Sequence, residues 1–317
     1  MQLRKTRPVP GGRTGFDRRT LKRLLTSWQL YLCLLPAVIY LFLFNYMPMY
    51  GLVIAFKNYK PGLGIGGSEW VGLKHFQQFV TSVQFPVLMR NTFLLSVYSL
   101  IFGFPMPVLL ALMLNEVRNL PFKKVVQNAT YIPYFISTVV MVAMIINFTS
   151  VDIGVINTFI QWFGGTPVDF MGKSEYFRTL YVVSGIWQSM GWNSIIYFAA
   201  LSGVDPQLYE AAQIDGASRL QRIWHVSLPG IAPTMIMLFI LNCGSLLNVG
   251  YEKVYLMQNS LNMDVSEVIS TYVYKVGLLG AKFSYTSAIG LFNTLINFAL
   301  LLAVNFISRR VSDVGLF

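Results

Sequence analysis

The feature that most constrains this chain is a set of six long stretches without a single Asp, Glu, Lys or Arg. They cover residues 24–56, 91–115, 125–151, 179–204, 226–251 and 283–308. Each is longer than the roughly 20 apolar residues that a helix needs to cross the hydrocarbon core of a bilayer. Only 12% of the residues are charged, about half the fraction that is usual in a soluble domain. The chain is therefore predicted to be an all-α integral membrane protein with six transmembrane helices.

The charge-free stretches also predict how the chain is organised. We expect the spans at about 28–50, 91–114, 127–148, 179–203, 229–249 and 284–307. They make up one transmembrane domain, 28–308, between a basic tail, 1–27, and a C-terminal segment, 309–317. The apolar pattern of residues 153–163 predicts in addition a short amphipathic helix at the membrane surface.

The distribution of basic residues predicts the orientation in the membrane. Six spans place both termini on the same side, and the segments of that side hold fifteen of the 24 Lys and Arg residues. Because Lys and Arg accumulate in cytoplasmic segments, both termini are predicted to be cytoplasmic. The net charge of +11 is then a property of the topology, and no nucleic-acid partner is expected.

The residue types that enzymes and ion-coupled carriers use are scarce in this chain. The two histidines, His75 and His225, fall on opposite predicted sides of the membrane, so they cannot share a metal ion. No pair of carboxylates lies within a predicted span, which disfavours proton coupling through intramembrane Asp or Glu. We therefore expect no catalytic site, no metal site and no cofactor bound by this chain.

The predicted cytoplasmic loop between the fourth and fifth spans begins with a strong helix signal. Asp205 is a favourable N-cap, and Pro206 suits the first helical position. The helix is expected to run to Ile214 or Asp215. Gly216 then predicts a left-handed residue that ends it.

A second short helix is predicted in the same loop. Ser218 and Gln221 have the spacing of a capping box, and this helix is expected to end before Pro229, where the fifth span begins. The loop, 205–228, should thus form two short helices at an angle to each other, parallel to the membrane on its inner face.

The same loop carries a motif that resembles a known family. Its anchors are Glu210-Ala211-Ala212, Asp215-Gly216-Ala217 and Leu228-Pro229. This string resembles the EAA signature of ABC-importer permeases, which reads EAA, two residues, DGA, about ten residues and LP. Residues 50–59, 70–73 and 90–92 are also similar to the oligosaccharide and polysaccharide branch, which includes alginate-type importers.

The resemblance implies a type I ABC importer permease fold and a set of partners. These are a second, related but distinct permease, two ATP-binding subunits that hold ATP and Mg²⁺, and an extracytoplasmic solute-binding protein. It also implies that the loop is a coupling helix that docks on an ATP-binding subunit in a bacterial plasma membrane. By position, the coupling residues are Glu210, Ala211, Ala212, Asp215 and Gly216.

Polar and aromatic residues inside the predicted spans are candidates for the solute pathway, because sugars bind to hydrogen-bonding groups and aromatic faces. Polar side chains in spans tend to face the protein interior. The fourth span offers the preferred group, Trp187, Gln188, Trp192, Asn193 and Tyr197. The fifth and sixth spans add Asn242, Ser245, Asn248, Asn293 and Asn297. The alternative for each residue is a hydrogen bond that only holds the helices together.

Three other functions remain open from the sequence. The chain could be an ABC permease for a peptide or a lipid precursor, a secondary carrier that works alone, or a membrane-embedded enzyme. A carrier would need an ion-coupling group within the membrane, and an enzyme would need a catalytic cluster. The sequence offers neither, so transport of a saccharide by a non-catalytic subunit is the favoured function.

Overall fold

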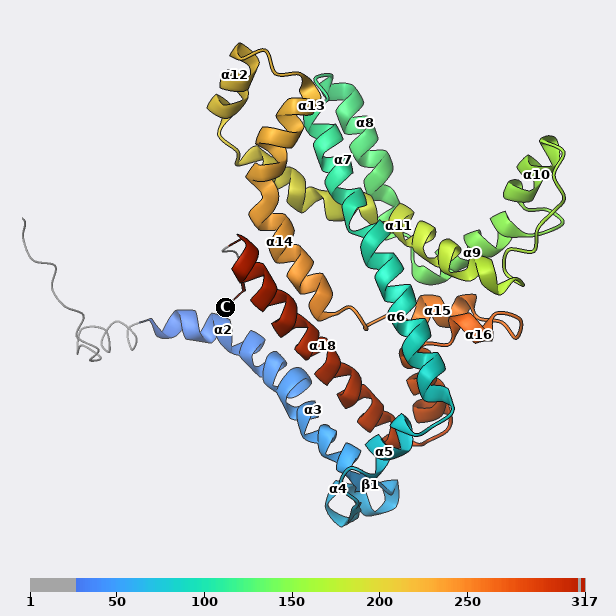
Figure 1. Ribbon diagram of the computed structural model, residues 1–317. Coiled ribbons are helices and arrows are strands. Elements are labelled where there is room, and N and C mark those ends of the chain that lie inside the picture. Colours follow the sequence, from blue (N-terminus) through green and yellow to red (C-terminus); the bar gives the residue numbers. More distant parts are fainter. Residues whose placement is uncertain (1–26, 313–314, 317) are drawn as a thin grey trace, which may run out of the picture. The chain divides into compact units, whose positions relative to one another are not determined.

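The computed structural model describes residues 27–312 and 315–316 (Figure 1). The chain divides into two compact units, Met1–Val53 and Ile54–Phe317, which are described separately. The predicted basic tail, 1–27, lies outside the described residues except for its last residue. The predicted C-terminal segment, 309–317, is described in part.

The first unit consists of one apolar helix with a local distortion. Helix α2 (Trp28–Leu41) passes into the π-helical turn η1 (Phe42–Tyr46), then into α3 (Met47–Met49) and the 3-10 helix η2 (Tyr50–Phe56), which runs on beyond this unit. Pro48 lies two residues after the π-turn. A proline ring clashes with the carbonyl four residues earlier in a regular α-helix. The wider turn accommodates this proline without ending the helix.

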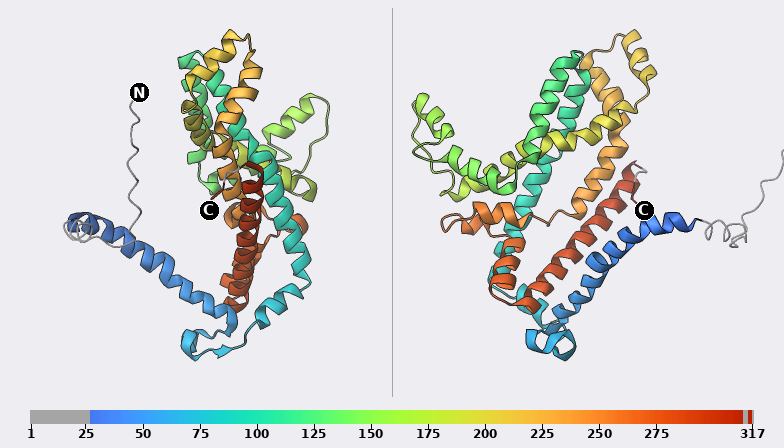
Figure 2. Two further views of the ribbon diagram at one scale, coloured as in Figure 1. Left: turned by 60° about the vertical axis from the view of Figure 1, so that its left-hand side comes forward. Right: turned by 180° about the vertical axis from the view of Figure 1, so that it is seen from behind.

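The second unit is a bundle of helices whose connections carry short helices of their own (Figure 2). A short antiparallel pair, β1 (Lys57–Asn58) and β2 (Glu69–Trp70), opens it. The first half contains η3 (Pro61–Leu63), α4 (Gly64–Gly67), α5 (Lys74–Val80), α6 (Gln84–Gly103), α7 (Pro105–Glu116), α8 (Leu120–Tyr131), η4 (Ile132–Phe135), α9 (Thr138–Thr149) and α10 (Val155–Trp162). The second half contains α11 (Ser174–Ser202), α12 (Pro206–Ile214), α13 (Arg219–Arg222), η5 (Ile223–Ser227), α14 (Leu228–Gly244), α15 (Tyr251–Met257), α16 (Met263–Ser266), α17 (Ile269–Val273), η6 (Tyr274–Leu279) and α18 (Phe283–Ser312).

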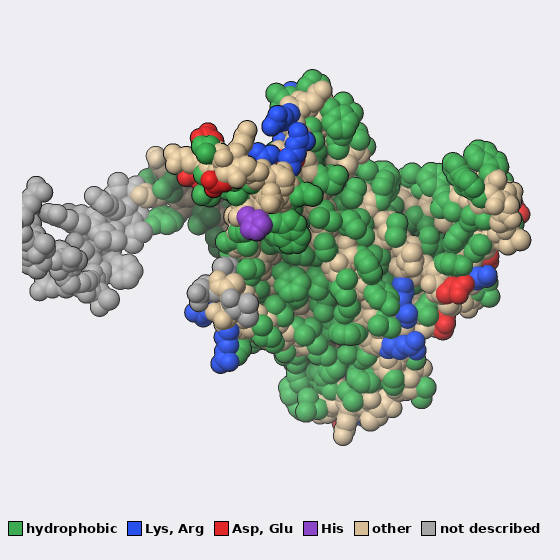
Figure 3. Space-filling model, turned by 45° about the horizontal axis from the view of Figure 1, so that its top comes forward, with side chains coloured by type: hydrophobic (Ala, Val, Ile, Leu, Met, Phe, Trp, Pro, Cys, Tyr) green, Lys and Arg blue, Asp and Glu red, His purple; other side chains and the backbone are tan. Residues whose placement is uncertain are grey.

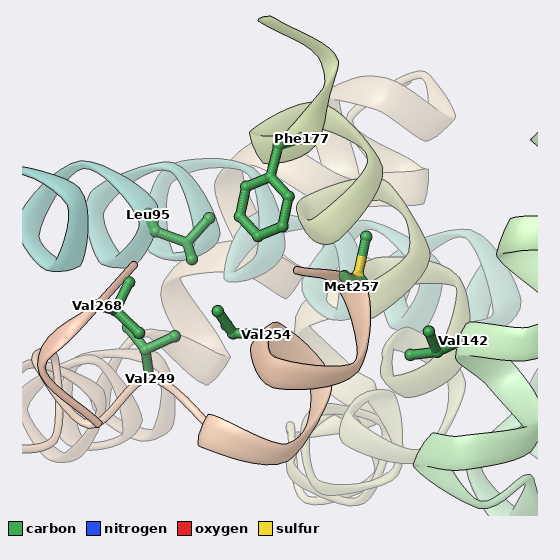
Figure 4. Packing of buried hydrophobic residues seen from close by; sticks show 7 residues of the cluster. All are labelled: Leu95, Val142, Phe177, Val249, Val254, Met257 and Val268. Carbon is green, nitrogen blue, oxygen red and sulfur yellow. The ribbon is translucent and has the colours of Figure 1, made fainter. Parts of the chain in front are cut away.

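Helix α11 lies at the centre of this unit and packs against α6, α7, α8 and α14, while α14 runs beside α18 (Figure 1). Two buried clusters hold the centre together. One joins α7, α11 and α14 through Val108, Tyr197 and Ile231. The other joins α6, α9, α11 and α15 and is drawn in Figure 4. Elsewhere the surface is apolar, and hydrophobic side chains cover most of the face shown in Figure 3.

The helices that could cross a membrane match the predicted spans only in part. Among the described residues, four are long and apolar enough: Trp28–Phe56, Gln84–Glu116, Arg219–Gly244 and Phe283–Arg310. A fifth results if Leu120–Phe135 and Thr138–Thr149, bent by 103°, are counted as one span. The predicted fourth span corresponds to α11, a helix that is long enough but too polar to pass the same test. The count of six spans is therefore not reproduced by length and apolarity alone.

The fifth predicted span differs from expectation at its start. We expected a separate short helix that ends before Pro229, but α13, η5 and α14 form one continuous helix, Arg219–Gly244. The π-turn η5 supplies the physical reason. It ends two residues before Pro229, and its closing bond runs from the Leu228 N–H to the Ile223 carbonyl. This wider turn makes room for the proline ring, which would clash with the His225 carbonyl in a regular helix.

The short helix predicted at 153–163 is confirmed as α10, which buries one polar residue. The Asn157 side chain is 1% exposed. It donates to the carbonyls of Thr149, Ser150 and Val168 and accepts from the Val168 N–H. A buried amide with all its hydrogen bonds satisfied stabilises the loop that it bridges.

Helices α8 and α11 approach each other closely at Gly191, where a Cβ atom would overlap the Thr130 carbonyl. Small residues allow such approaches in membrane proteins. We expect Gly191→Ala to cost about 1–3 kcal/mol of stability, because overpacking forces the backbones apart. The measurement is the midpoint temperature of aggregation of the purified chain in detergent. The control is Gly290→Ala in α18, where nothing lies within 4 Å of the added atom. Equal midpoints for the two variants would contradict the close approach.

Candidate functional site

A cavity of about 920 Å³ with both polar and apolar side chains in its walls lies within the second unit. Its walls come from α6, α7, α11, α14 and α15. Amide, hydroxyl and aromatic side chains face it from several of these helices, among them Ser96, Ser99, Gln188, Ser189, Trp192, Asn193, Tyr197, Asn242, Ser245 and Asn248. Such a lining can donate and accept hydrogen bonds and can offer flat apolar faces to a ligand.

The structure brings seven of the ten residues predicted for the solute pathway to this cavity. They are Gln188, Trp192, Asn193 and Tyr197 of α11, Asn242 of α14, and Ser245 and Asn248 of the segment that follows α14. Their spacing of three or four residues explains why the α11 group shares one helical face. The polar residues that make α11 too polar to count as an apolar span thus lie mainly on the face that lines the cavity.

The three remaining predicted residues do not line the main cavity. Trp187 is 42% exposed and lies outside it. Asn293 lines a smaller neighbouring pocket together with Asn248. Asn297 is buried and accepts a 2.9 Å hydrogen bond from the Leu247 N–H. Both Asn293 and Asn297 donate to the Asn248 Oδ1 atom, at 3.1 and 3.0 Å. These three amides join α18 to the segment between α14 and α15.

Two of the cavity residues are held in place by neighbouring elements. The Gln188 amide donates 2.9 Å to the Ile136 carbonyl at the break between η4 and α9. The Trp192 ring stacks on Tyr134, with 4.6 Å between ring centroids, and meets Phe135 edge-on at 5.6 Å. A ring that is fixed on two sides presents its remaining face in one orientation, which favours recognition of a rigid ligand.

Sequence analysis missed Lys253, which also lines the cavity. Its Nζ donates 2.8 Å to the Tyr181 carbonyl and lies 4.5 Å from the centroid of the Tyr181 ring. Burial away from water lowers the pKa of Lys253 to about 8. The residue follows the fifth predicted span closely, but nothing in its local sequence specifies that it folds back toward the pathway.

The predicted coupling loop has the local structure that its capping signals indicated. The Asp205 carboxylate accepts a 2.9 Å hydrogen bond from the Gln207 N–H at the start of α12. At the other end, Gly216 has φ +77°. There the Gly216 and Ala217 N–H groups bond back to the carbonyls of Gln213 and Ala212 in a Schellman arrangement.

The second half of the loop is anchored to the bundle. Ser218 and Gln221 form the predicted capping box. Arg222 forms an ion pair of 3.5 Å with Glu116 at the end of α7, and Tyr209 of α12 shares a 3.0 Å hydrogen bond with Ser227. These contacts tie the elbow formed by α12 and α13 to α7 and η5.

The side chains on the outward side of the elbow are exposed. Of the predicted coupling residues, Glu210, Ala211, Asp215 and Gly216 are exposed and Ala212 is half-buried. Several large apolar side chains are exposed beside them, including Leu208, Ile214, Leu220 and Trp224. Ile214 is 87% exposed. An exposed apolar group rimmed by acidic residues is typical of a protein docking surface.

No group of three or more His, Cys, Asp or Glu residues that could hold a metal ion occurs in the described part of the chain. The two histidines make separate contacts with backbone. His75 bonds the Lys57 carbonyl at 3.2 Å, and His225 bonds the Gln221 carbonyl at 2.9 Å.

Comparison with known proteins agrees with this arrangement. The chain is 46% identical over 300 residues to the polygalacturonan/rhamnogalacturonan transport system permease protein YteP of Bacillus subtilis (strain 168), covering 95% of this chain and 94% of that protein. Protein LplB of the same organism is 44% identical and covers 99% and 98%.

Two solved structures share the fold. One is the crystal structure of a bacterial ABC transporter involved in the import of the acidic polysaccharide alginate, with TM-score 0.85, 41% identity and coverage of 93% and 99%. The other is a bacterial alginate ABC transporter in complex with an alginate pentasaccharide-bound periplasmic protein, with TM-score 0.86, 40% identity and coverage of 94% and 100%.

Residues 92–313 match the family described as the binding-protein-dependent transport system inner membrane component. The match begins within α6, continues to α18 and includes both the cavity and the elbow. Members of this family are ABC transport permeases, which are multi-pass membrane proteins without catalytic activity of their own. The fold, the motif in the elbow and these similarities establish that the chain belongs to the family of binding-protein-dependent ABC transport permeases.

Proposed function

We propose that this chain is a permease subunit of an ATP-driven importer that takes up an oligosaccharide or polysaccharide delivered by a solute-binding protein. The observation that carries the proposal is the cavity, which combines the amides of Asn193 and Asn242 with the fixed ring of Trp192. Sugars present hydroxyl groups and apolar C–H faces, and this lining suits both. Relatives that transport polygalacturonan or alginate support the same substrate class.

The partners follow from the family and from the exposed elbow. A second, distinct permease completes the pathway, and two ATP-binding subunits hold ATP and Mg²⁺, while this chain binds no cofactor. Glu210, Ala211, Ala212, Asp215 and Gly216 contact one ATP-binding subunit. The elbow lies in the cytoplasm, and so do both termini. A solute-binding protein docks on the opposite side. The structure of the alginate transporter in complex with a pentasaccharide-bound periplasmic protein supports such a partner.

The assembly is tested by purifying the tagged chain from its host membrane and identifying the proteins that co-elute. The proposal expects a second permease and an ATP-binding subunit, and uptake of saccharide by the reconstituted complex only with ATP and loaded binding protein. Uptake by the isolated chain along an ion gradient would overturn it in favour of a secondary carrier.

The pathway role of α11 makes a separate prediction. Asn193 is exposed to the cavity, so Asn193→Ala removes a hydrogen-bonding group from the wall. We expect saccharide uptake by the complex to fall about three- to tenfold, the equivalent of one hydrogen bond. Trp192→Ala should act similarly and widen the range of sugars accepted. Uptake is measured with labelled saccharide in proteoliposomes.

The matched control for this prediction is Asn147→Ala on α9. Asn147 is also an exposed helical asparagine, but its amide bonds only to the Ala143 carbonyl of its own helix, and it is not part of the cavity. Unchanged uptake kinetics for both Asn193→Ala and Trp192→Ala would remove α11 from the pathway.

A further inference from the structure

Lys253 occupies a fixed position at the cavity wall. It is on α15, and its neighbours Val254 and Met257 are completely buried against α6 and α11 (Figure 4). These two anchors fix the short helix in the protein. On α11, Gly185 lies beside the ammonium group, so that a Cβ atom there would be 3.3 Å from Nζ. The side chain is therefore held by packing on both sides.

The ammonium group of Lys253 has no acidic partner. Among the described residues that line the cavity, Lys253 is the only charged one. The ion pairs of the described residues are Arg222–Glu116 and Lys275–Glu267, and neither involves Lys253. Its neighbour is the Tyr181 carbonyl, which takes one of the three N–H donors. Two donors are left for a ligand.

A partly buried cation without a counter-charge is unfavourable, because little water compensates its charge. Charged groups placed at such cost within a membrane protein mark substrate or ion pathways. The lowered pKa of about 8 has the same cause, since burial disfavours the charged form. An anionic group of the solute would supply the missing charge. The surrounding amides and hydroxyls would bind its hydroxyl groups.

We propose that Lys253 is a specificity-determining residue that pairs with the carboxylate of an acidic, uronate-containing oligosaccharide as it passes through the cavity. This inference rests on the proposed function of the chain as a saccharide permease. It adds that the solute is anionic and names the residue that recognises its negative charge.

The experiment uses the complete transporter in proteoliposomes, with its binding protein saturated with trigalacturonate. Lys253→Gln is expected to lower the maximal rate of uptake at least about tenfold, the equivalent of one charge-assisted contact. Lys253→Arg keeps the charge and should stay within about threefold of the wild type. The KM for the loaded binding protein should remain unchanged in both, because Lys253 acts after delivery. The matched control, Lys282→Gln, removes the same charge from an exposed residue outside the cavity.

The pH dependence provides a second test, in which the uptake of each protein is compared with its own rate at pH 7. The neutral form of Lys253 prevails above a pKa of about 8, whereas uronate carboxylates stay ionised from pH 7 to 9. Wild-type uptake is therefore expected to fall between pH 7 and 9 toward the rate of Lys253→Gln. Lys253→Arg should keep its rate.

Other titratable groups near Lys253 are the same in both proteins, so the difference between the two profiles isolates Lys253. Tyr181 of α11 faces the ammonium. The same helix also carries Glu175, Tyr176, Arg178 and Tyr197. The neighbouring elements carry Arg90 and Tyr98 on α6, Tyr272 on α17, and Tyr251, Glu252 and Tyr255 on α15, and α9 carries none.

The outcomes separate the two proposals. If the wild-type transporter imports neither trigalacturonate nor another saccharide, the proposed function fails. If it imports trigalacturonate but Lys253→Gln does so at the wild-type rate, or the pH profiles of wild type and Lys253→Arg coincide, the role of Lys253 is overturned while the function stands.

Discussion

Replacement of Gly216 by proline is expected to abolish saccharide import, with a loss of at least about a hundredfold, while the chain still inserts into the membrane. Gly216 has φ +77°, and proline is restricted to φ near −65°. Proline also lacks the N–H that bonds the Gln213 carbonyl at the end of α12. The elbow would therefore open, and Glu210 and Ala211 would lose their position toward the ATP-binding subunit. Import and ATP hydrolysis are measured together in proteoliposomes, where hydrolysis should no longer depend on loaded binding protein.

The matched control is Gly164→Pro, because Gly164 has nearly the same backbone conformation, φ +79°, and is also surrounded by open space. It follows α10, far along the chain from the elbow. Import should stay within a few-fold of the wild type. Equal losses in the two variants would attribute the effect to backbone strain in general. Full import by Gly216→Pro would refute the coupling role of the elbow.

Replacement of Asn91 by leucine is expected to cost about 3 kcal/mol or more, the largest loss of stability among the substitutions considered. Asn91 is 1% exposed on α6. Its amide donates to the carbonyls of Asp264 and Glu267 at 2.8 and 3.1 Å, and its oxygen accepts from Arg178 at 3.3 Å. Leucine has a similar volume but leaves these groups without partners. The segment between α15 and α18 should become sensitive to protease at temperatures where the wild type is resistant.

Two neighbours on α6 provide graded controls for this prediction. The Thr92 hydroxyl accepts a single hydrogen bond of 2.9 Å from the Ile269 N–H, so Thr92→Val should cost only about 1 kcal/mol. The buried Ser96 hydroxyl has no hydrogen-bond partner among the described residues, and Ser96→Ala should be close to neutral. A loss for Asn91→Leu no larger than that for Ser96→Ala would contradict the bridging role of this amide.

The elbow was predictable from sequence because its structure is set by local hydrogen bonds. Asp205, Gly216 and Ser218 each act on groups within a few residues, and their capping roles depend little on the rest of the fold. The cavity-facing side of α11 was predictable for a similar reason. Its polar residues recur at helical spacing, and polar groups within a membrane domain turn inward.

Features that depend on tertiary structure were not predictable in this way. Lys253 reaches the cavity only because α15 packs against α9 and α17 and buries Val254 and Met257 in the cluster that α6 and α11 share, and nothing in its local sequence specifies that packing. Asn297 lies four residues after Asn293, the helical spacing that marked both as pathway candidates. Its side chain instead binds the Leu247 N–H, which is fifty residues away in the sequence, and local sequence does not reveal such a partner. At Pro229, sequence rules predict a helix boundary, and the alternative, a π-turn, depends on the packing around it.

The continuous helix Arg219–Gly244 has a mechanical consequence. Its first turn belongs to the elbow, and Asn242 near its last turn belongs to the cavity wall. One helix of roughly 39 Å, at 1.5 Å per residue, thus connects the elbow and the cavity wall without a loop. A displacement imposed at Arg219 would therefore reach Asn242 along one continuous helix. The π-turn at Ile223–Ser227 lies between the two ends and has a hydrogen-bond register that departs from that of an α-helix.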